Sequence, residues 1–263
     1  MTTHFDTTLE DYPQHDHRFS NVIKMTKRER RKIQKENQTK NQLKNLSPKR
    51  TNPITLNQQR AFDYFDKDKN ILLHGLAGTG KTFISLYLAL DEILNSNSIK
   101  EKVTIVRSVV PTRDMGFLPG DNIEKARVYE QPYVSIINEL FYPKKDVYDF
   151  LKKQGVIEFV TTSFIRGLTL QDTIVVVDEC QNMSYHELDS VITRLGENCK
   201  VLFCGDFRQS DLYRQSEKEG LLLFMKVLNS MQSFSCVEFN KEDIVRSELV
   251  KEYILSKLEQ GII

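Results

Sequence analysis

Apolar positions after residue 53 follow two patterns, short stretches that are mostly apolar and longer stretches with helical spacing. The short runs predict β-strands at 70–74, 103–107, 156–160, 173–177, 200–204 and 235–239. The longer stretches predict helices at 55–65, 82–94, 186–195, between 204 and 235, and at 243–258. The run Thr173-Ile-Val-Val-Val177 is entirely β-branched, as expected for a strand covered on both faces. This alternation predicts an α/β fold, a mostly parallel sheet with helices on both faces.

Residues 1–50 have a different character, poor in large apolar side chains and rich in Lys, Asn, Gln and Thr. Such a composition cannot bury a core, so we expect a flexible tail. Within it, Thr26 and Glu29 fit a capping box that predicts a helix over 27–44. Pro48 and Pro53 predict a linker at 47–53, and a single folded domain over 51–263. The 263 residues leave room for one such domain and a tail, so a second lobe would have to come from another chain.

The overall charge conceals a strongly basic segment. The chain carries 37 Lys+Arg against 36 Asp+Glu, yet residues 24–50 hold 11 against 2 and residues 51–263 hold 25 against 30. No apolar run approaches the ~18 residues that span a bilayer. The N-terminal residues are polar and acidic, and the four cysteines form no CxxC pair. We therefore expect a cytoplasmic protein with reduced thiols and no membrane partner.

The segment Gly75-Leu-Ala-Gly-Thr-Gly-Lys-Thr82 matches the pattern G-x-x-x-x-G-K-[ST] between a predicted strand and a predicted helix. Glycines let such a loop curl so that its backbone N–H groups face a phosphate, and the helix N-terminus adds positive potential. The candidate ATP contacts are Gly75, Leu76, Ala77, Gly78, Thr79, Gly80, Lys81 and Thr82. Lys81 can reach the β- and γ-phosphates, and the Thr82 hydroxyl can bind Mg²⁺. The sequence thus predicts ATP and Mg²⁺ as ligands.

Further polar groups end two predicted strands at the carboxyl edge of the sheet, where open α/β folds bind ligands. Asp178 and Glu179 follow the apolar run 173–177. This order favours a metal-binding carboxylate followed by a general base for hydrolysis. Gln209 comes shortly after the strand at 200–204 and is a candidate γ-phosphate contact. A simple turn is the alternative for residues 205–209.

Together, these motifs resemble motifs I, II and III of superfamily 1 helicases, and more closely the PhoH-like family of phosphate-starvation-inducible ATPases. The matching residues are Arg107, Gly116-Phe-Leu-Pro-Gly-Asp121, Glu124-Lys125, Ile165-Arg-Gly-x-Thr169, Asp178-Glu-x-Gln-Asn182, Thr193-Arg-x-Gly196 and Glu242-Asp-Ile-Val-Arg246. The resemblance runs from about 54 to 258. Ser108, Cys180 and Cys204 depart from the family pattern by small-residue changes. Phage-encoded members are similarly short, so a phage origin is one implication.

The resemblance implies a RecA-like domain with one ATP site and a set of residue roles. Gln59 resembles the family's glutamine ahead of motif I, which reads adenine, and Gln58 is a close rival. Arg246 resembles the motif VI arginine and is the first candidate to stabilise the transferring phosphoryl group, ahead of Arg194 and Arg166. A structural ion pair is the alternative for each. Because helicases take this arginine from a second lobe, the resemblance implies a homo-oligomer, such as a hexameric ring, in which a neighbouring subunit supplies it.

RNA or another single-stranded nucleic acid is the expected partner. Residues 24–50 can contact phosphates, but they carry no aromatic side chain for base stacking, and a solubilising tail is the alternative. The segment 108–135 and its surroundings supply the other candidate contacts, which are Arg107, Arg113, Lys125, Arg127, Tyr129, Tyr133 and Arg166. An ATP-driven switch or remodeller that acts on a protein partner, without unwinding, is the competing function.

Overall fold

The structure is a computed structural model that describes residues 41–95, 98–108, 122–207 and 215–262. Most of the helix predicted over 27–44 therefore lies outside the described residues, and so do Arg113 and Gln209. None of the helices in these ranges is both long and apolar enough to span a membrane.

The compact domain begins at Lys44, before the expected boundary at 51. Leu46 and Pro48 are buried, and the Lys49 amide donates to the Leu140 carbonyl at 2.6 Å. Prolines predict a break in helical structure here, but they do not prevent an extended segment from packing. The first part of the expected linker therefore belongs to the domain.

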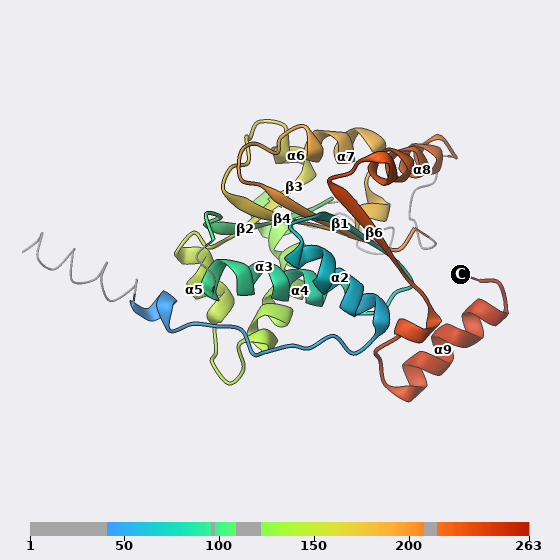
Figure 1. The fold of residues 1–263 in the computed structure, drawn as a ribbon, viewed down its shortest axis with the longest axis horizontal. Helices are drawn as coiled ribbons and strands as arrows, with labels where there is room; N and C mark the ends of the chain where they lie inside the picture. Colours follow the sequence, from blue (N-terminus) through green and yellow to red (C-terminus); the bar gives the residue numbers. More distant parts are fainter. Residues whose placement is uncertain (1–40, 96–97, 109–121, 208–214, 263) are drawn as a thin grey trace, which may run out of the picture. The chain divides into compact units, whose positions relative to one another are not determined.

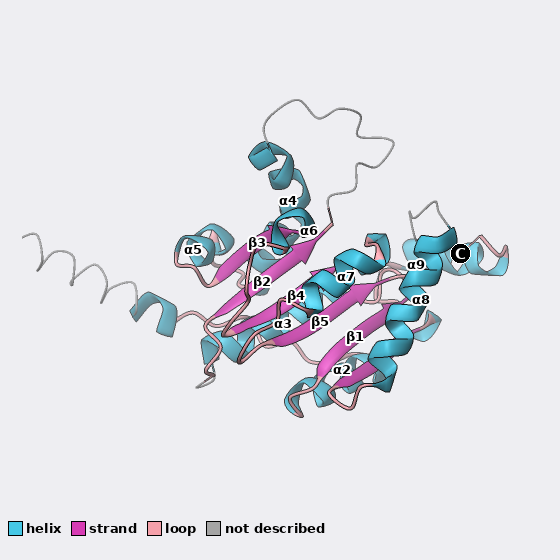
Figure 2. Cartoon of the chain, turned by 90° about the horizontal axis from the view of Figure 1, so that it is seen from above, coloured by secondary structure: helices cyan, strands magenta, loops and turns pink. Residues whose placement is uncertain are grey.

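In the described part of the chain, six strands form one wholly parallel sheet. The strands are β1 Asn70–Gly75, β2 Lys102–Arg107, β3 Ile157–Thr161, β4 Thr173–Asp178, β5 Lys200–Gly205 and β6 Phe234–Phe239. Their order is β3-β2-β4-β5-β1-β6, so β5 separates the phosphate-loop strand β1 from the acidic strand β4 (Figure 2). Every residue of β4 and β5 is buried, as their apolar runs predict. All the predicted strands are confirmed.

Helices cover both faces of this sheet (Figure 1). One face carries α2 Leu56–Asp66, α3 Lys81–Asn95, α4 Asn122–Leu140 and α5 Val147–Lys153. The other carries α6 Thr162–Ile165, α7 Tyr185–Ile192 and α8 Gln215–Ser230. A last helix, α9 Glu248–Glu259, follows β6 and has no fully buried residue. The predicted α/β fold, a parallel sheet with helices on both faces and a phosphate loop after β1, is confirmed.

Two helical regions differ from the prediction. The apolar pattern does not predict α4, whose polar positions and internal Pro132 obscure its periodicity, nor the shorter α5 and α6. It also predicts a helix from 243, whereas Lys241–Asp243 form a short 3₁₀ helix and α9 begins at Glu248. Between them, Val245 donates its amide to the Gly78 carbonyl at 3.0 Å. That tertiary hydrogen bond takes a donor that a continuous helix would use internally.

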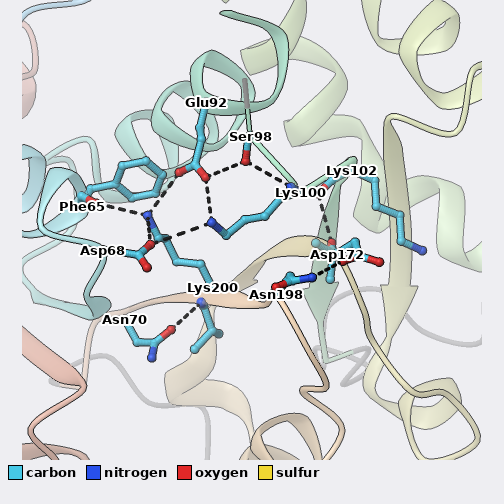
Figure 3. A network of polar contacts seen from close by, with 12 residues as sticks. Phe65, Asp68, Asn70, Glu92, Ser98, Lys100, Lys102, Asp172, Asn198 and Lys200 are labelled. Carbon is cyan, nitrogen blue, oxygen red and sulfur yellow. Dashed lines mark hydrogen bonds and ion pairs between the residues drawn. The ribbon is translucent and has the colours of Figure 1, made fainter. Parts of the chain in front are cut away.

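Charged side chains around the buried Lys200 join helix ends at the amino ends of the strands (Figure 3). Lys200, at the start of β5, donates to the Phe65 carbonyl at 3.1 Å and to Glu92 at 3.2 Å. Its ammonium also pairs with Asp68 at 2.8 Å and lies 4.0 Å from the centroid of the Phe65 ring. Lys100 brings a second cation to Glu92 at 2.8 Å. This network ties the ends of α2 and α3 to β5, on the side of the sheet away from the phosphate loop.

Candidate nucleotide site

The phosphate loop connects β1 to α3 at the carboxyl edge of the sheet. Gly75, Gly78 and Gly80 have φ angles of 111°, 78° and 82°, which favour glycine. A Cβ atom at Gly75 would lie 2.1 Å from a carbonyl oxygen of β6, so a side chain is excluded there. From the end of β5, the Asp206 carboxylate accepts the Ala77 amide at 3.1 Å. The neighbouring strands therefore hold the loop in its curl.

Lys81, the first residue of α3, folds back over its own loop. Its ammonium donates to the Gly75 and Leu76 carbonyls at 2.9 and 2.7 Å, and the residue is buried. Burial lowers the pKa of Lys81, although the negative charge of Asp206 opposes this. Neutral carbonyls are weaker partners for an ammonium than anionic oxygens are. A phosphate group that enters the loop would therefore be a better acceptor.

Asp178 ends β4 and contacts two hydroxyl groups. Its Oδ1 accepts from Thr82 Oγ1 at 2.7 Å, and its Oδ2 accepts from the Tyr133 hydroxyl at 2.9 Å. Burial and the charge of Glu179 raise the pKa of Asp178, while the two hydroxyl donors lower it. A hydroxyl and a carboxylate oxygen side by side are hard ligands of the kind that Mg²⁺ takes beside phosphate oxygens and water. Thr82 and Asp178 therefore fit the metal that a phosphate loop implies.

Glu179 leaves β4 in a left-handed conformation, with a φ of 52°. Such backbone is strained for a residue with a side chain and clusters at functional sites. Glu179 Oε2 accepts from the Gln181 side-chain amide at 2.6 Å, and Gln181 Oε1 accepts the Asp206 backbone amide at 3.1 Å. The ends of β4 and β5 are thereby connected beside the phosphate loop. Gln209, three residues after Asp206, lies outside the described residues.

Three residues predicted to contact nucleic acid lie at or near Asp178 in the structure. Tyr133 is fully buried in α4 with its hydroxyl on Asp178, and Tyr129 is also buried. Arg107 is in register with Asp178 across β2 and β4, and its guanidinium lies 5.7 Å from the Tyr129 ring centroid. Burial lowers the pKa of Arg107, but its interactions with the Tyr133 hydroxyl and with the negative charge of Glu179 outweigh it and raise that pKa. Because the apolar pattern does not predict α4, the sequence held no signal for these inward-facing rings.

The other predicted nucleic-acid contacts are less constrained. Arg127 is exposed on α4, and Arg166 is exposed directly after α6. Lys125 lies within α4, but its side chain is outside the described part of the structure, as is all of Arg113. The role of these four residues in binding stays a prediction.

Arg246 lies on the phosphate loop of its own chain. A Cβ atom at Gly78 would be 3.0 Å from Arg246 Cγ and 3.3 Å from Arg246 Nε. Arg194, by contrast, follows α7 at the opposite edge of the sheet, where the next residue bridges to Leu170 ahead of β4. Its Nε is buried without a hydrogen-bond partner among the described residues. Within one chain Arg246 therefore lies beside the phosphate loop, whereas Arg194 does not.

Of the two candidate glutamines, the structure brings Gln58 to the phosphate loop. Gln58 is 4% exposed, and its side-chain amide donates to the Thr79 carbonyl at 3.0 Å. Gln59 is exposed and donates to Asp63 at 2.8 Å along α2. Successive helix positions point about 100° apart, so only one of these neighbours can face the loop. Gln58, the rival in the sequence prediction, has the better position for a nucleotide contact.

Comparison with known sequences gives consistent relatives. The family model described as PhoH-like protein matches residues 50–256. A PhoH-like protein of Mycobacterium leprae is 33% identical over 209 residues, covering 78% of this chain and 58% of the relative. A PhoH-like protein of Bacillus subtilis is 30% identical, covering 80% of this chain and 65% of the relative. For protein PhoH of Escherichia coli K12 the identity is 30%, and the shares are 76% and 56%. The chain thus spans less than two thirds of the length of these relatives.

Solved structures show more distant similarity. The large terminase of bacteriophage D6E aligns with a TM-score of 0.46 at 11% identity, over 77% of this chain and 50% of the terminase chain. Pif1 of Bacteroides in complex with ADP-AlF4 aligns with a TM-score of 0.41 at 15% identity, over 81% and 47% of the two chains. The sequence match is therefore the one that assigns a family. Since it spans the phosphate loop, the β4 carboxylates and Arg246, the chain belongs to the PhoH-like family.

Proposed function

We propose that the chain hydrolyses ATP with Mg²⁺ and couples hydrolysis to RNA or another single strand, as part of an oligomer. The observation that carries the proposal is the 2.7 Å contact between Thr82 in the phosphate loop and Asp178 at the end of β4. These residues lie 96 positions apart in the chain. Two separate motifs thus form one site, with Glu179 directly beside it.

The site residues have distinct proposed roles. Lys81 exchanges its carbonyl partners for the β- and γ-phosphates, while Thr82 and Asp178 hold Mg²⁺. The ion supplies stabilisation of the negative charge that develops on the phosphate oxygens. Glu179 accepts a proton from the water that attacks the γ-phosphate. Gln209 is the proposed γ-phosphate contact.

Two further residues complete the proposed site. Arg246, beside Gly78, is the cation for the transition state, a role worth on the order of 10³-fold in rate where it has been measured. Gln58, rather than Gln59, is the proposed adenine contact, which its hydrogen bond to the phosphate loop supports.

Glu179→Gln separates chemistry from binding. Loss of the general base should lower turnover by about 10²- to 10⁴-fold, while ATP affinity stays nearly constant. Phosphate release and fluorescent-nucleotide binding measure the two quantities. Glu197→Gln is the matched control, because Glu197 is exposed shortly before β5 begins, at the amino ends of the strands. Retained turnover in Glu179→Gln contradicts the assigned role.

Mixing experiments test whether Arg246 acts within its own chain. Arg246→Ala should abolish turnover and leave nucleotide binding intact. A mixture of Arg246→Ala and Lys81→Ala chains should remain inactive, because the contact with Gly78 is made within one chain. Recovery of activity in the mixture would show that a neighbouring subunit supplies the arginine.

A protein partner is the second candidate. Leu222, Leu223 and Val227 on α8 are 64%, 52% and 43% exposed, and clustered apolar surface favours contact with another protein. Turnover that rises with single-stranded RNA supports the first function, and turnover that RNA leaves unchanged supports the second.

A further inference from the structure

The carboxyl-terminal end of the basic segment passes beside the loop between α4 and α5 (Figure 1). The Lys49 amide donates to the Leu140 carbonyl at 2.6 Å, and the Lys144 ammonium donates to the Asn45 carbonyl at 3.0 Å. Residues 45–49 therefore run alongside residues 140–144, although 99 positions separate Asn45 from Lys144.

The two stretches that run side by side carry several exposed cations and one exposed aromatic ring. Tyr142 is 73% exposed. The exposed cations of the same two stretches are Lys49, Arg50, Lys144 and Lys145. Residues 44–50 and 139–153 together hold 7 Lys+Arg against 3 Asp+Glu, the acidic ones being Glu139, Asp146 and Asp149. An exposed aromatic ring among cations is the combination that binds single strands without reading their sequence.

This surface supplies what the regions identified from the sequence lack. Residues 24–50 contain no aromatic side chain. In α4, Tyr129 and Tyr133 are buried against Arg107 and Asp178, so neither ring is available to a base. Tyr142 follows α4 and is exposed beside the end of the basic segment. The fold brings Lys49 and Arg50 to the stretch that already carries Tyr142, Lys144 and Lys145.

We propose that Tyr142, Lys49, Arg50, Lys144 and Lys145 form a binding surface for single-stranded nucleic acid. The cations contact successive phosphates, and one base stacks on the Tyr142 ring. Because every base has an aromatic face, the surface accepts any sequence. The inference rests on the proposed function, since it locates the strand to which ATP hydrolysis is coupled.

Charge reversal in the full chain tests the phosphate contacts. Arg50→Glu combined with Lys145→Glu should weaken binding of fluorescent oligo-uridine and oligo-thymidine by at least about tenfold at low salt. The slope of log affinity against log salt should become shallower by about 1.4, since each lost contact to a single strand is worth about 0.7. Fluorescence anisotropy measures both. Unchanged affinity and slope overturn the proposal.

Tyr142→Ala tests stacking, with Tyr142→Phe as its matched variant. Loss of the ring should weaken binding roughly 5- to 100-fold without changing the salt slope, because stacking involves no counterion. Phenylalanine keeps the aromatic face and should restore binding. If the two variants bind equally well, at whatever affinity, the ring does not stack on a base and the proposal fails.

Lys67→Glu combined with Lys226→Glu controls for net charge, because both lysines are exposed elsewhere, after α2 and on α8. At about 0.1 M salt this control should bind the oligonucleotides within about twofold of the unmodified chain, since charges far from the surface are largely screened there. Equal losses in the control and in Arg50→Glu with Lys145→Glu would mean that overall charge determines binding, which overturns the surface. Thermal unfolding of each variant confirms that it is folded.

ATP hydrolysis without a strand distinguishes failure of this surface from failure of the proposed function. The surface variants should hydrolyse ATP at the unmodified rate and lose stimulation by the strand. If the unmodified chain binds the strand and the variants bind it equally well, the surface is wrong and the proposed function stands. If the unmodified chain hydrolyses ATP but binds no strand, the surface and the coupling are wrong while the ATPase stands. If the unmodified chain binds the strand but hydrolyses no ATP, the proposed ATPase activity is wrong. The binding affinities of the variants then still show whether the surface is correct.

Discussion

Two lysines are buried at opposite ends of the strands, Lys81 at the carboxyl ends and Lys200 at the amino ends, and their partners differ. Lys200, 4% exposed, is paired with the carboxylates of Glu92 and Asp68. Lys81, 8% exposed, donates to neutral groups of its own loop, and burial lowers its pKa. A buried cation that is paired with carboxylates holds structure, whereas one that rests on carbonyls can exchange them for an anionic ligand. Burial alone therefore does not distinguish a structural lysine from a ligand-binding one. The groups that each lysine contacts make the distinction.

The largest expected effect is on catalysis at the carboxyl edge. Lys81→Ala should lower ATP turnover by about 10³-fold, because it removes a preorganised cation from the phosphates. Thermal stability should change little, since no hydrogen-bonded carboxylate loses a partner. Phosphate release and thermal unfolding on one preparation measure both. If Lys81→Ala strongly lowers thermal stability but keeps normal turnover per folded molecule, Lys81 has a structural role. It would then not differ from Lys200.

The corresponding experiment at the amino ends of the strands replaces Lys200. Lys200→Ala should cost about 2 kcal/mol of unfolding free energy, because the partly buried Glu92 keeps only Lys100 as a cation and the Phe65 carbonyl loses its donor. Turnover per folded molecule should match the unmodified chain, as urea denaturation and phosphate release will show. Lys200→Met keeps an apolar stem against the Phe65 ring and separates lost charge from lost packing. Normal stability with impaired turnover would contradict the structural role.

A smaller effect on turnover is expected from Tyr133, whose hydroxyl connects α4 to Asp178, the carboxylate proposed to hold Mg²⁺. Tyr133→Phe removes the donor to Asp178 Oδ2, so the Mg²⁺ concentration for half-maximal turnover should rise about tenfold. Nucleotide binding without Mg²⁺ should not change. Tyr148→Phe is the matched control, since this buried tyrosine of α5 donates to Glu130 instead. The same Mg²⁺ response in both variants would point to a general disturbance of the helices.

The smallest expected effect is on acid stability. Burial raises the pKa of Glu92, but the hydrogen bond from Lys100 and the charge of Lys200 outweigh it and hold that pKa below its ordinary 4.5. The unfolded chain therefore binds more protons in this range, so the contribution of Glu92 is complete above pH 4.5 and is lost as pH falls through the folded pKa. Glu92→Gln should show a flatter decline of unfolding free energy below that pH in urea titrations. Parallel curves would mean that the charge of Glu92 does not stabilise the fold.

Local signals made the strands and the phosphate loop predictable. β4 and β5 are almost entirely apolar, the other strands are short and mostly apolar, and Gly75 to Thr82 form one uninterrupted motif. The rotation of α2 about its axis was not predictable to one residue. The sequence prediction therefore preferred Gln59, whereas Gln58 faces the loop. The late start of α9 was not predictable either, because it depends on the hydrogen bond from Val245 to Gly78.

The sequence by itself determined a parallel α/β sheet, a phosphate loop, an acidic strand end and a basic segment, since apolar runs and contiguous motifs act locally. Only the tertiary structure decided that Tyr133 meets Asp178, 45 positions away, and that Tyr142 lies beside residues 45–49. Sheet order and helix phase control such contacts, and no local pattern specifies them. For the same reason Lys81 and Lys200 differ less by their own chemistry than by the groups that the fold places around them.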